Sequence, residues 1–174
     1  MKVNKEQKRK KNRLQGFDYS KNGVFFVTIC TIDKKNLLSD IMPINVGVGA
    51  LNDPLVQLKE SGIIVQKEIE KMNDIYSDLY ISKYVIMPNH IHLMVEINGQ
   101  SGSSGAPTPT RANESLPKYV STLKRFTNKK IGKSIWQRSF YDHIIRDEDD
   151  YIYHLQYITE NPKKWLLGKD EYYA

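Results

Sequence analysis

Two histidines separated by a single residue are the strongest candidates for chemistry in this sequence. His90 and His92 occupy alternate positions in a segment whose other side is aliphatic, comprising Ile91, Leu93, Val95 and Ile97. This alternation predicts a β-strand with one buried face. Side chains two residues apart on a strand lie on the same side, about 6–7 Å apart along the backbone, so both imidazoles could bind one metal ion. Without a third ligand, they could equally be histidines satisfied by solvent or within the core.

A third ligand and a nucleophile can come from the C-terminal part of the chain. Tyr157 and Asn161 are four residues apart in a segment, 149–161, that is expected to be helical, so they share one helix face. If that face packs over the sheet, the side-chain oxygen of Asn161 can complete a metal site with the two histidines, and Tyr157 lies one turn away. Tyr153 shares the same face and is the rival nucleophile. Packing of Tyr157 and an ordinary helix-end role for Asn161 are the alternatives.

The sequence is basic, which favours a polyanionic partner. The net charge is +6 and the pI is near 9.2, and lysine and arginine concentrate in the first thirteen residues and in 118–138. The residues expected to contact phosphates are Lys124, Arg125, Lys129 and Arg138. His143 and Trp136 could also contact DNA, but a strand histidine and a buried aromatic anchor explain them at least as well.

Together these features fit a metal-assisted attack of a tyrosine hydroxyl on a DNA phosphodiester. A divalent ion bound by two imidazoles and one amide oxygen keeps open positions for phosphate oxygens. A phenol has a pKa near 10, so Tyr157 must lose its proton as it attacks. The product would be a covalent phosphotyrosine that conserves the energy of the broken bond. The alternatives are a non-catalytic nucleic-acid-binding module with a ferredoxin-like sheet, and a hydrolase whose metal activates water.

Composition predicts one globular domain over residues 1–174. The chain is 40% hydrophobic and 26% charged, and it has no apolar run near the roughly 20 residues that cross a bilayer, so no membrane partner and a cytoplasmic location are expected. Cys30 is the single cysteine, which excludes an internal disulfide and a cysteine-based zinc site. Three segments fall outside the expected core: a basic flexible arm (1–15), a flexible Gly/Ser/Pro-rich insert (98–114) and a tail that could cover the site (166–174).

The order of the expected elements indicates the fold class. The expected strands cover 24–31, 79–87, 90–97 and 136–146, with a short edge strand or bulged hairpin at 45–51. Helices are expected from 53–54 onward, with a kink or cap at 61–62, and from 115 onward, with Phe126 facing inward. A last helix is capped by Asp147 and ended by Pro162. This order predicts an α+β, ferredoxin-like antiparallel sheet with helices on one face and an added C-terminal helix that carries the nucleophile.

Several separated segments resemble one known family. Residues 87–92, Met-Pro-Asn-His-Ile-His, resemble the signature of the His-hydrophobic-His endonuclease superfamily. Residues 136–146 and 157–162 resemble the REP-associated tyrosine transposases, relatives of the single-tyrosine transposases of small bacterial insertion sequences, and residues 25–31 match the family's opening strand. The similarity spans about 16–165, with the insert in a variable region.

The resemblance implies a specific chemistry for these residues. It implies a Mg²⁺ or Mn²⁺ ion bound by His90, His92 and Asn161, with Tyr157 as the nucleophile. It also implies a 5′-phosphotyrosine intermediate on single-stranded DNA, with recognition of a hairpin from a repeated extragenic palindrome. The insertion-sequence branch has Gln in place of Asn161, which places this chain with the palindrome-associated branch. Membership of that branch implies a monomer rather than a homodimer. It also implies a bacterial protein associated with the nucleoid.

Overall fold

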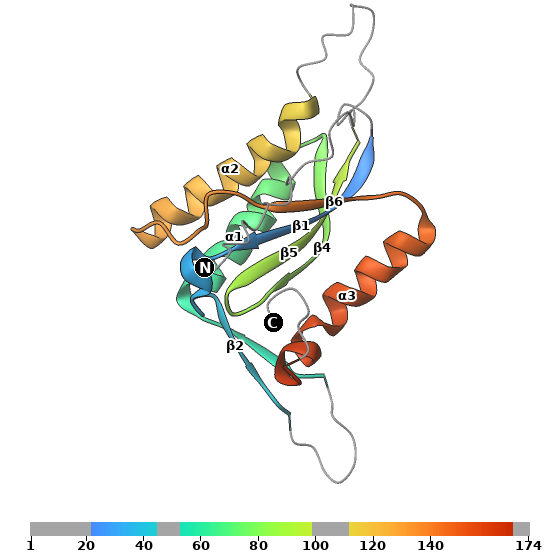
Figure 1. Cartoon of the computed structure of the whole chain (residues 1–174). Helices are drawn as coiled ribbons and strands as arrows, with labels where there is room; N and C mark the ends of the chain where they lie inside the picture. Colours follow the sequence, from blue (N-terminus) through green and yellow to red (C-terminus); the bar gives the residue numbers. More distant parts are fainter. Residues whose placement is uncertain (1–21, 45–52, 99–111, 169–174) are drawn as a thin grey trace, which may run out of the picture.

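A four-stranded antiparallel sheet forms the centre of the protein (Figure 1). The computed structural model describes residues 22–44, 53–98 and 112–168. The strands follow the order β4-β5-β1-β6 across the sheet. Their bounds are Gly23–Cys30 for β1, Leu79–Ile86 for β4, His90–Ile97 for β5 and Tyr141–Ile145 for β6. With helices between β1 and β4 and between β5 and β6, this is the β-α-β-β-α-β arrangement, and the ferredoxin-like α+β prediction is confirmed.

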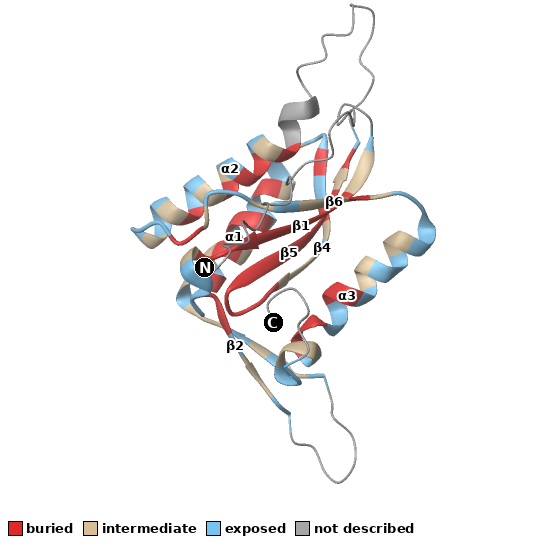
Figure 2. Cartoon of the chain, viewed as in Figure 1, coloured by how far each residue is buried: buried red, intermediate tan, exposed pale blue. Residues whose placement is uncertain are grey.

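Helices cover both faces of the sheet. Helices α1 (Glu60–Ile75) and α2 (Ala112–Ile131) pack together on one face, and α3 (Glu148–Leu166) lies against the other, as Figure 1 shows. Strands β1 and β5 are therefore buried on both sides (Figure 2). Among the described residues, no helix is both long and apolar enough to span a membrane.

The alternation predicted for β5 is confirmed by its packing. The aliphatic side, from Ile91 to Ile97, joins the main core beneath α1 and α2. On the opposite side, Met94 packs with Phe26 of β1 and with Tyr157 and Ile158 of α3 in a smaller apolar cluster. The histidine side of β5 therefore faces the helix that was expected to carry the nucleophile.

The region before α1 differs from the prediction. Leu55–Leu58, expected in a helix, form strand β3, which pairs antiparallel with β2 (Ser39–Met42) in a separate two-stranded sheet. Alternating half-buried and exposed residues along β3 fit a strand, and the helix begins only at Glu60. The strand or hairpin predicted at 45–51 lies outside the described residues.

Gly62 lies in the first turn of α1, where it allows a close backbone contact in place of the predicted kink. A Cβ atom added there would lie 2.0 Å from the backbone oxygen of Leu38. Since this contact is with backbone, Gly62→Ala should destabilise the protein by about 1–3 kcal/mol or prevent folding. Urea unfolding would measure the loss, with Ser61→Ala in the same turn as the control. Equal effects of the two substitutions would contradict this prediction.

Helix α2 and the chain leading to β6 also depart from the prediction in part. Phe126, expected to face inward, is 39% exposed. The extended segment predicted from Trp136 forms a regular strand only at Tyr141–Ile145, although Trp136 makes an isolated bridge with Thr31. The Trp136 side chain is buried, and its Nε1 donates a hydrogen bond to Oγ1 of Thr127 at 2.7 Å. The anchoring alternative therefore accounts for this tryptophan.

Helix α3 begins where the sequence predicts but ends later. The Asp147 side chain caps it by accepting a hydrogen bond from the backbone N–H of Asp150 at 2.9 Å. Pro162 does not end the helix, which continues to Leu166. Proline removes one helical hydrogen bond. Pro162 and Asn161 are both buried, so packing of this turn offsets that loss.

Candidate metal and tyrosine site

Strand β5 places two imidazoles side by side beneath α3. His90 and His92 are both completely buried, and they lie opposite Cys30 and Thr28 of the neighbouring strand β1. The two Nε2 atoms are 3.0 Å apart. This matches the prediction that the pair lies on one side of the strand and converges on one point.

Neighbouring side chains hold each imidazole through its Nδ1 atom. Nδ1 of His90 lies 2.6 Å from Oδ1 of Asn89, which is an acceptor, so the proton of a neutral His90 is on Nδ1 and its Nε2 carries a lone pair. Nδ1 of His92 lies 2.8 Å from the hydroxyl of Thr28. A hydroxyl can donate or accept, so Thr28 supports either tautomer of His92. Both Nε2 atoms can therefore present lone pairs to a cation.

Burial keeps both histidines neutral. Together with a smaller effect of the positive charge of Lys34, it lowers the pKa of His90 to about 3. The pKa of His92 lies well below 6.5, because of burial first and then of repulsion from His90 and His154 when these are charged. Neutral imidazoles are the form that binds metal ions.

Asn161 of α3 lies beside this pair with an unsatisfied amide. Its side chain is completely buried, and neither Oδ1 nor Nδ2 has a hydrogen-bonding partner within the described part of the chain. The amide lies close enough to His90 to favour the protonated imidazole, but without the geometry of a hydrogen bond. Because buried polar groups in proteins are nearly always paired, this orphaned amide indicates a missing partner such as a bound cation.

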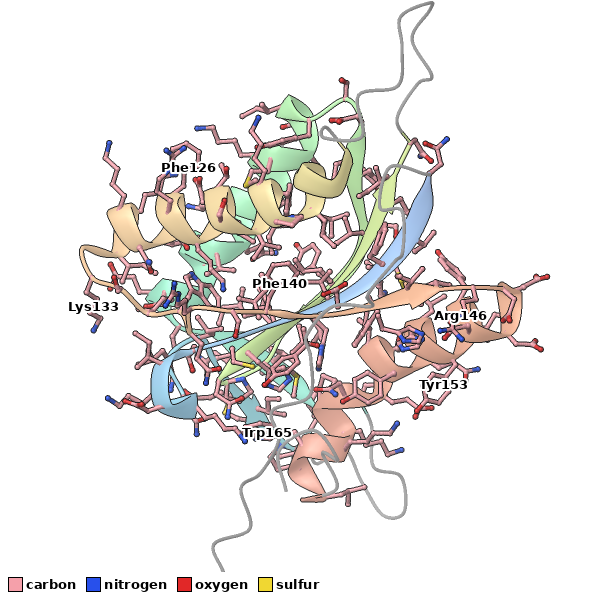
Figure 3. The ribbon with its side chains drawn as sticks, turned by 45° about the horizontal axis from the view of Figure 1, so that its top comes forward. Phe126, Lys133, Phe140, Arg146, Tyr153 and Trp165 are labelled. Atoms are coloured by element: carbon pink, nitrogen blue, oxygen red, sulfur yellow. The ribbon has the colours of Figure 1, made fainter. Side chains whose placement is uncertain are left out.

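Tyr157 is the tyrosine of α3 that contacts the histidines. Its ring lies edge-on to the rings of His92 and Phe26, at centroid distances of 5.3 and 5.7 Å. The rival, Tyr153, which is labelled in Figure 3, is 61% exposed, and its ring contacts that of His154. The structure thus brings His90, His92, Asn161 and Tyr157 together and leaves Tyr153 outside the cluster.

The four predicted phosphate contacts lie elsewhere. Lys124, Arg125 and Lys129 are on α2, which covers the opposite face of the sheet, and Arg138 is exposed in the segment that follows α2. The Lys124 ammonium donates to the backbone carbonyls of Gln137 and Ser139 at 2.9 and 2.8 Å, and burial lowers its pKa to about 8. Its main contacts therefore fix the segment after α2, whereas Arg125, Lys129 and Arg138 are exposed.

Sequence reasoning missed several residues near the site. The ammonium of Lys164 lies 5.0 Å from the centroid of the Tyr157 ring, and the Trp165 ring lies 6.2 Å from that of His90. Both follow Asn161 by three or four residues, so helical spacing could have identified them. Lys34 belongs to a turn with left-handed backbone angles (φ 51°), and Thr28 is set opposite His92 only by strand pairing. The sequence alone does not show that Lys34 and Thr28 lie near the histidines, because this depends on the turn at Lys34 and on the pairing of β1 with β5.

The buried histidines should make the metal-free protein sensitive to acid. The pKa of His90 falls from 6.5 to about 3 on folding, so between these values the unfolded chain binds more protons, and stability should fall as the pH drops below 6.5. Each histidine should contribute a slope of at most about 1.4 kcal/mol per pH unit. Urea unfolding in EDTA would measure this slope, which His92→Gln should reduce to about half. An unchanged slope in that variant would contradict the prediction.

The chain is similar in sequence to three known bacterial proteins, two of which are named as REP-associated tyrosine transposases. No family model matches the chain. An uncharacterized protein of Haemophilus influenzae is 31% identical over 172 residues, which cover 90% of this chain and 89% of that protein. A second protein of that organism, named as a candidate REP-associated tyrosine transposase, is 35% identical over 82 residues (45% of this chain and 47% of its own). The REP-associated tyrosine transposase of Escherichia coli K12 is 30% identical over 84 residues (48% and 44%).

A solved structure shares the fold. The structure of a REP-associated tyrosine transposase bound to a REP hairpin superposes with a TM-score of 0.52 at 22% identity, covering 82% of this chain and 67% of that one. The sequence matches to the two named relatives span about half of each protein. The chain is therefore similar in sequence to REP-associated tyrosine transposases over about half of its length, and the solved structure shows that it shares their fold.

Proposed function

We propose that this protein cleaves and rejoins single-stranded DNA through a covalent bond to Tyr157, assisted by a divalent metal ion. One observation carries the proposal: two neutral imidazoles converge at 3.0 Å beside the unsatisfied amide of Asn161, with the Tyr157 ring against His92. Metal ligands and a nucleophile from two different elements of the fold thus meet in one place.

We propose that His90, His92 and Asn161 bind Mg²⁺ or Mn²⁺, of which two imidazole ligands favour Mn²⁺. Around an octahedral ion with bonds of about 2.1 Å, adjacent ligand atoms lie about 3.0 Å apart. This is the observed separation of the two Nε2 atoms. All three ligands are uncharged, so they leave the full positive charge of the ion for phosphate oxygens.

The residues of the chain then divide the reaction between them. When bound, the ion would supply Lewis-acid polarisation and orientation of the scissile phosphate. The Tyr157 oxygen forms a bond to phosphorus as the bond from phosphorus to the 3′ oxygen breaks. The phenol gives up its proton and the leaving 3′ oxygen takes one up. The Lys164 ammonium, 5.0 Å from the Tyr157 ring centroid, favours the developing phenolate. The product is a 5′-phosphotyrosine, and attack by a 3′ hydroxyl reverses the step and rejoins the strand.

The site is closed in this conformation. The side chains of His90, His92 and Asn161 have no exposed surface, and the ring of Trp165, which is labelled in Figure 3, lies 6.2 Å from that of His90. DNA binding therefore requires movement around the C-terminal turn of α3. The tail at 166–174, proposed to cover the site, follows directly after Trp165, and 169–174 lie outside the described residues.

A hairpin in single-stranded DNA is the proposed substrate. The relative whose structure was solved binds a REP hairpin, and the related names support the same class of DNA for this chain. The exposed Arg125, Lys129 and Arg138 are the proposed phosphate contacts, with a lesser role for the partly buried Lys124. We further propose that one chain forms a single catalytic domain that acts as a monomer. A non-catalytic binding module would leave the orphaned Asn161 amide unexplained.

An adduct assay tests this function. The protein is incubated with end-labelled single-stranded hairpin DNA from its genomic neighbourhood and Mn²⁺ or Mg²⁺, then run on a denaturing gel. We expect a protein-linked DNA band that EDTA and His92→Ala both remove. DNA binding without an adduct or cleavage in any metal would overturn the proposal in favour of a binding module.

A further inference from the structure

A second cluster of potential metal ligands lies where β6 meets the start of α3. His143 comes from β6, and Asp150 and His154 come from the first two turns of α3. Nε2 of His143 lies 2.9 and 3.1 Å from the two carboxylate oxygens of Asp150. Nδ1 of His154 lies 3.0 Å from the same carboxylate. These ligand atoms all lie within 4.8 Å of one another.

We propose that His143, Asp150 and His154 bind a second divalent ion, a transition metal of the Zn²⁺ type. Two imidazoles with one carboxylate are ligands that Zn²⁺ and similar ions favour over Mg²⁺. Adjacent ligands of a tetrahedral ion with bonds of about 2.1 Å lie about 3.4 Å apart, slightly more than the 2.9–3.1 Å between the imidazole nitrogens and the Asp150 carboxylate. The side chains of His143 and Asp150 are 41% and 20% exposed, so water can fill the remaining positions of the ion.

The three ligands are already held in place. The rings of His143 and His154 are stacked, with centroids 4.6 Å apart, and His154 also packs on Phe26 at 4.7 Å. The Asp150 carboxylate accepts a hydrogen bond from the backbone N–H of Arg146 at 3.1 Å. Support of this kind from outside the ligand set orients ligands and strengthens metal binding.

Two effects oppose binding of the ion: the partial positive charge at the start of α3, and the hydrogen bonds that the ligands make without metal. The start of a helix carries roughly half a positive charge, but the acidic side chains of Glu148, Asp149 and Asp150 in the first turn exceed it. Without metal, the cluster is a hydrogen-bonded network, since Nδ1 of His154 also lies 2.9 Å from the Asp150 backbone oxygen. The ion must replace these hydrogen bonds, and each neutral imidazole must bind it through the ring nitrogen that carries no proton.

The site would tie β6 to the helix that carries Tyr157. Its ligands bridge the two elements, so the ion should stabilise the first turns of α3 against local opening. This inference does not rest on the proposed DNA chemistry, because it can be read from metal binding and stability alone.

Metal stoichiometry distinguishes this site from the one around His90. The full chain is stripped with EDTA and titrated with Co²⁺, whose visible absorption reports imidazole coordination. Asp150→Asn should lose one bound ion relative to the parent, whereas Asp149→Asn, which removes the same charge from the same helical turn, should lose none. In a His90→Ala/His92→Ala chain, the ion held by Asp150 should remain.

The shift in melting temperature on adding Zn²⁺ provides the second measurement. At a free concentration about 100-fold above Kd, Zn²⁺ should raise Tm by about 5–10 °C in the parent and in Asp149→Asn. Part of this shift should be lost in Asp150→Asn and in His143→Gln, and in the His90→Ala/His92→Ala background the same two substitutions should abolish it; each variant is compared with its own metal-free sample so that a less stable variant remains informative. Equal shifts and stoichiometry in Asp149→Asn and Asp150→Asn would overturn the proposal and leave the cluster as a hydrogen-bonded network only.

Discussion

Replacing Tyr157 with phenylalanine should abolish the covalent protein–DNA adduct and reduce strand cleavage by at least about 10³-fold. The substitution removes only the hydroxyl that would bond to phosphorus. The ring keeps its edge contacts with Phe26 and His92, so the fold around the site should persist. Adduct formation on a denaturing gel gives the primary measurement, and DNA retention under native conditions shows that binding survives.

Tyr153→Phe is the matched control for this experiment. Tyr153 lies on the same helix but is 61% exposed and contacts His154 rather than the imidazole pair. This variant should cleave DNA at close to the parental rate. An adduct that persists in Tyr157→Phe and disappears in Tyr153→Phe would reassign the nucleophile. Metal-dependent cleavage by Tyr157→Phe without any adduct would instead indicate attack by water.

The central part of the fold was predictable because its patterns are local. Strand β5 alternates between aliphatic residues and histidines, and β1 is a nearly continuous apolar run, as expected for a strand buried on both faces. The four-residue spacing of Tyr157 and Asn161 placed both on one face of α3, and both are buried there. Residue type and spacing were therefore sufficient to select these residues as candidates for one site.

Features that depend on tertiary contacts were not predictable in the same way. Leu55 and Leu58 fit the helical pattern of the following residues, but they pair with β2, a partner that only the folded chain supplies. Pro162 is an ordinary helix terminator, but its burial carries α3 one turn further. Lys124 looked like a surface cation, whereas its ammonium is directed to backbone carbonyls after α2. In each case, packing overrides the local preference.

The orphaned amide of Asn161 leads to the second large prediction. Asn161→Leu replaces a buried, unpaired amide with an apolar group of similar size. Because the folded protein no longer buries an unsatisfied polar group, the metal-free variant should be more stable than the parent by about 1–2 kcal/mol. Metal-dependent cleavage should be lost at the same time, since the third proposed ligand is gone. Urea unfolding in EDTA and the adduct assay measure the two effects.

Asn161→Asp provides the opposing control at the same position. A carboxylate keeps a ligand oxygen but buries a charge, so this variant should be less stable than the parent without metal and should gain more stability from added Mn²⁺. A larger gain in stability from Mn²⁺ in Asn161→Asp than in Asn161→Leu is therefore the result that distinguishes a cation-binding position from one that is merely buried. If Asn161→Leu instead destabilised the protein and retained metal-dependent cleavage, Asn161 would be a packing residue, and the imidazole pair would need a different third ligand. A residue that binds a catalytic cation is expected to lower the stability of the metal-free protein and still to be required for cleavage.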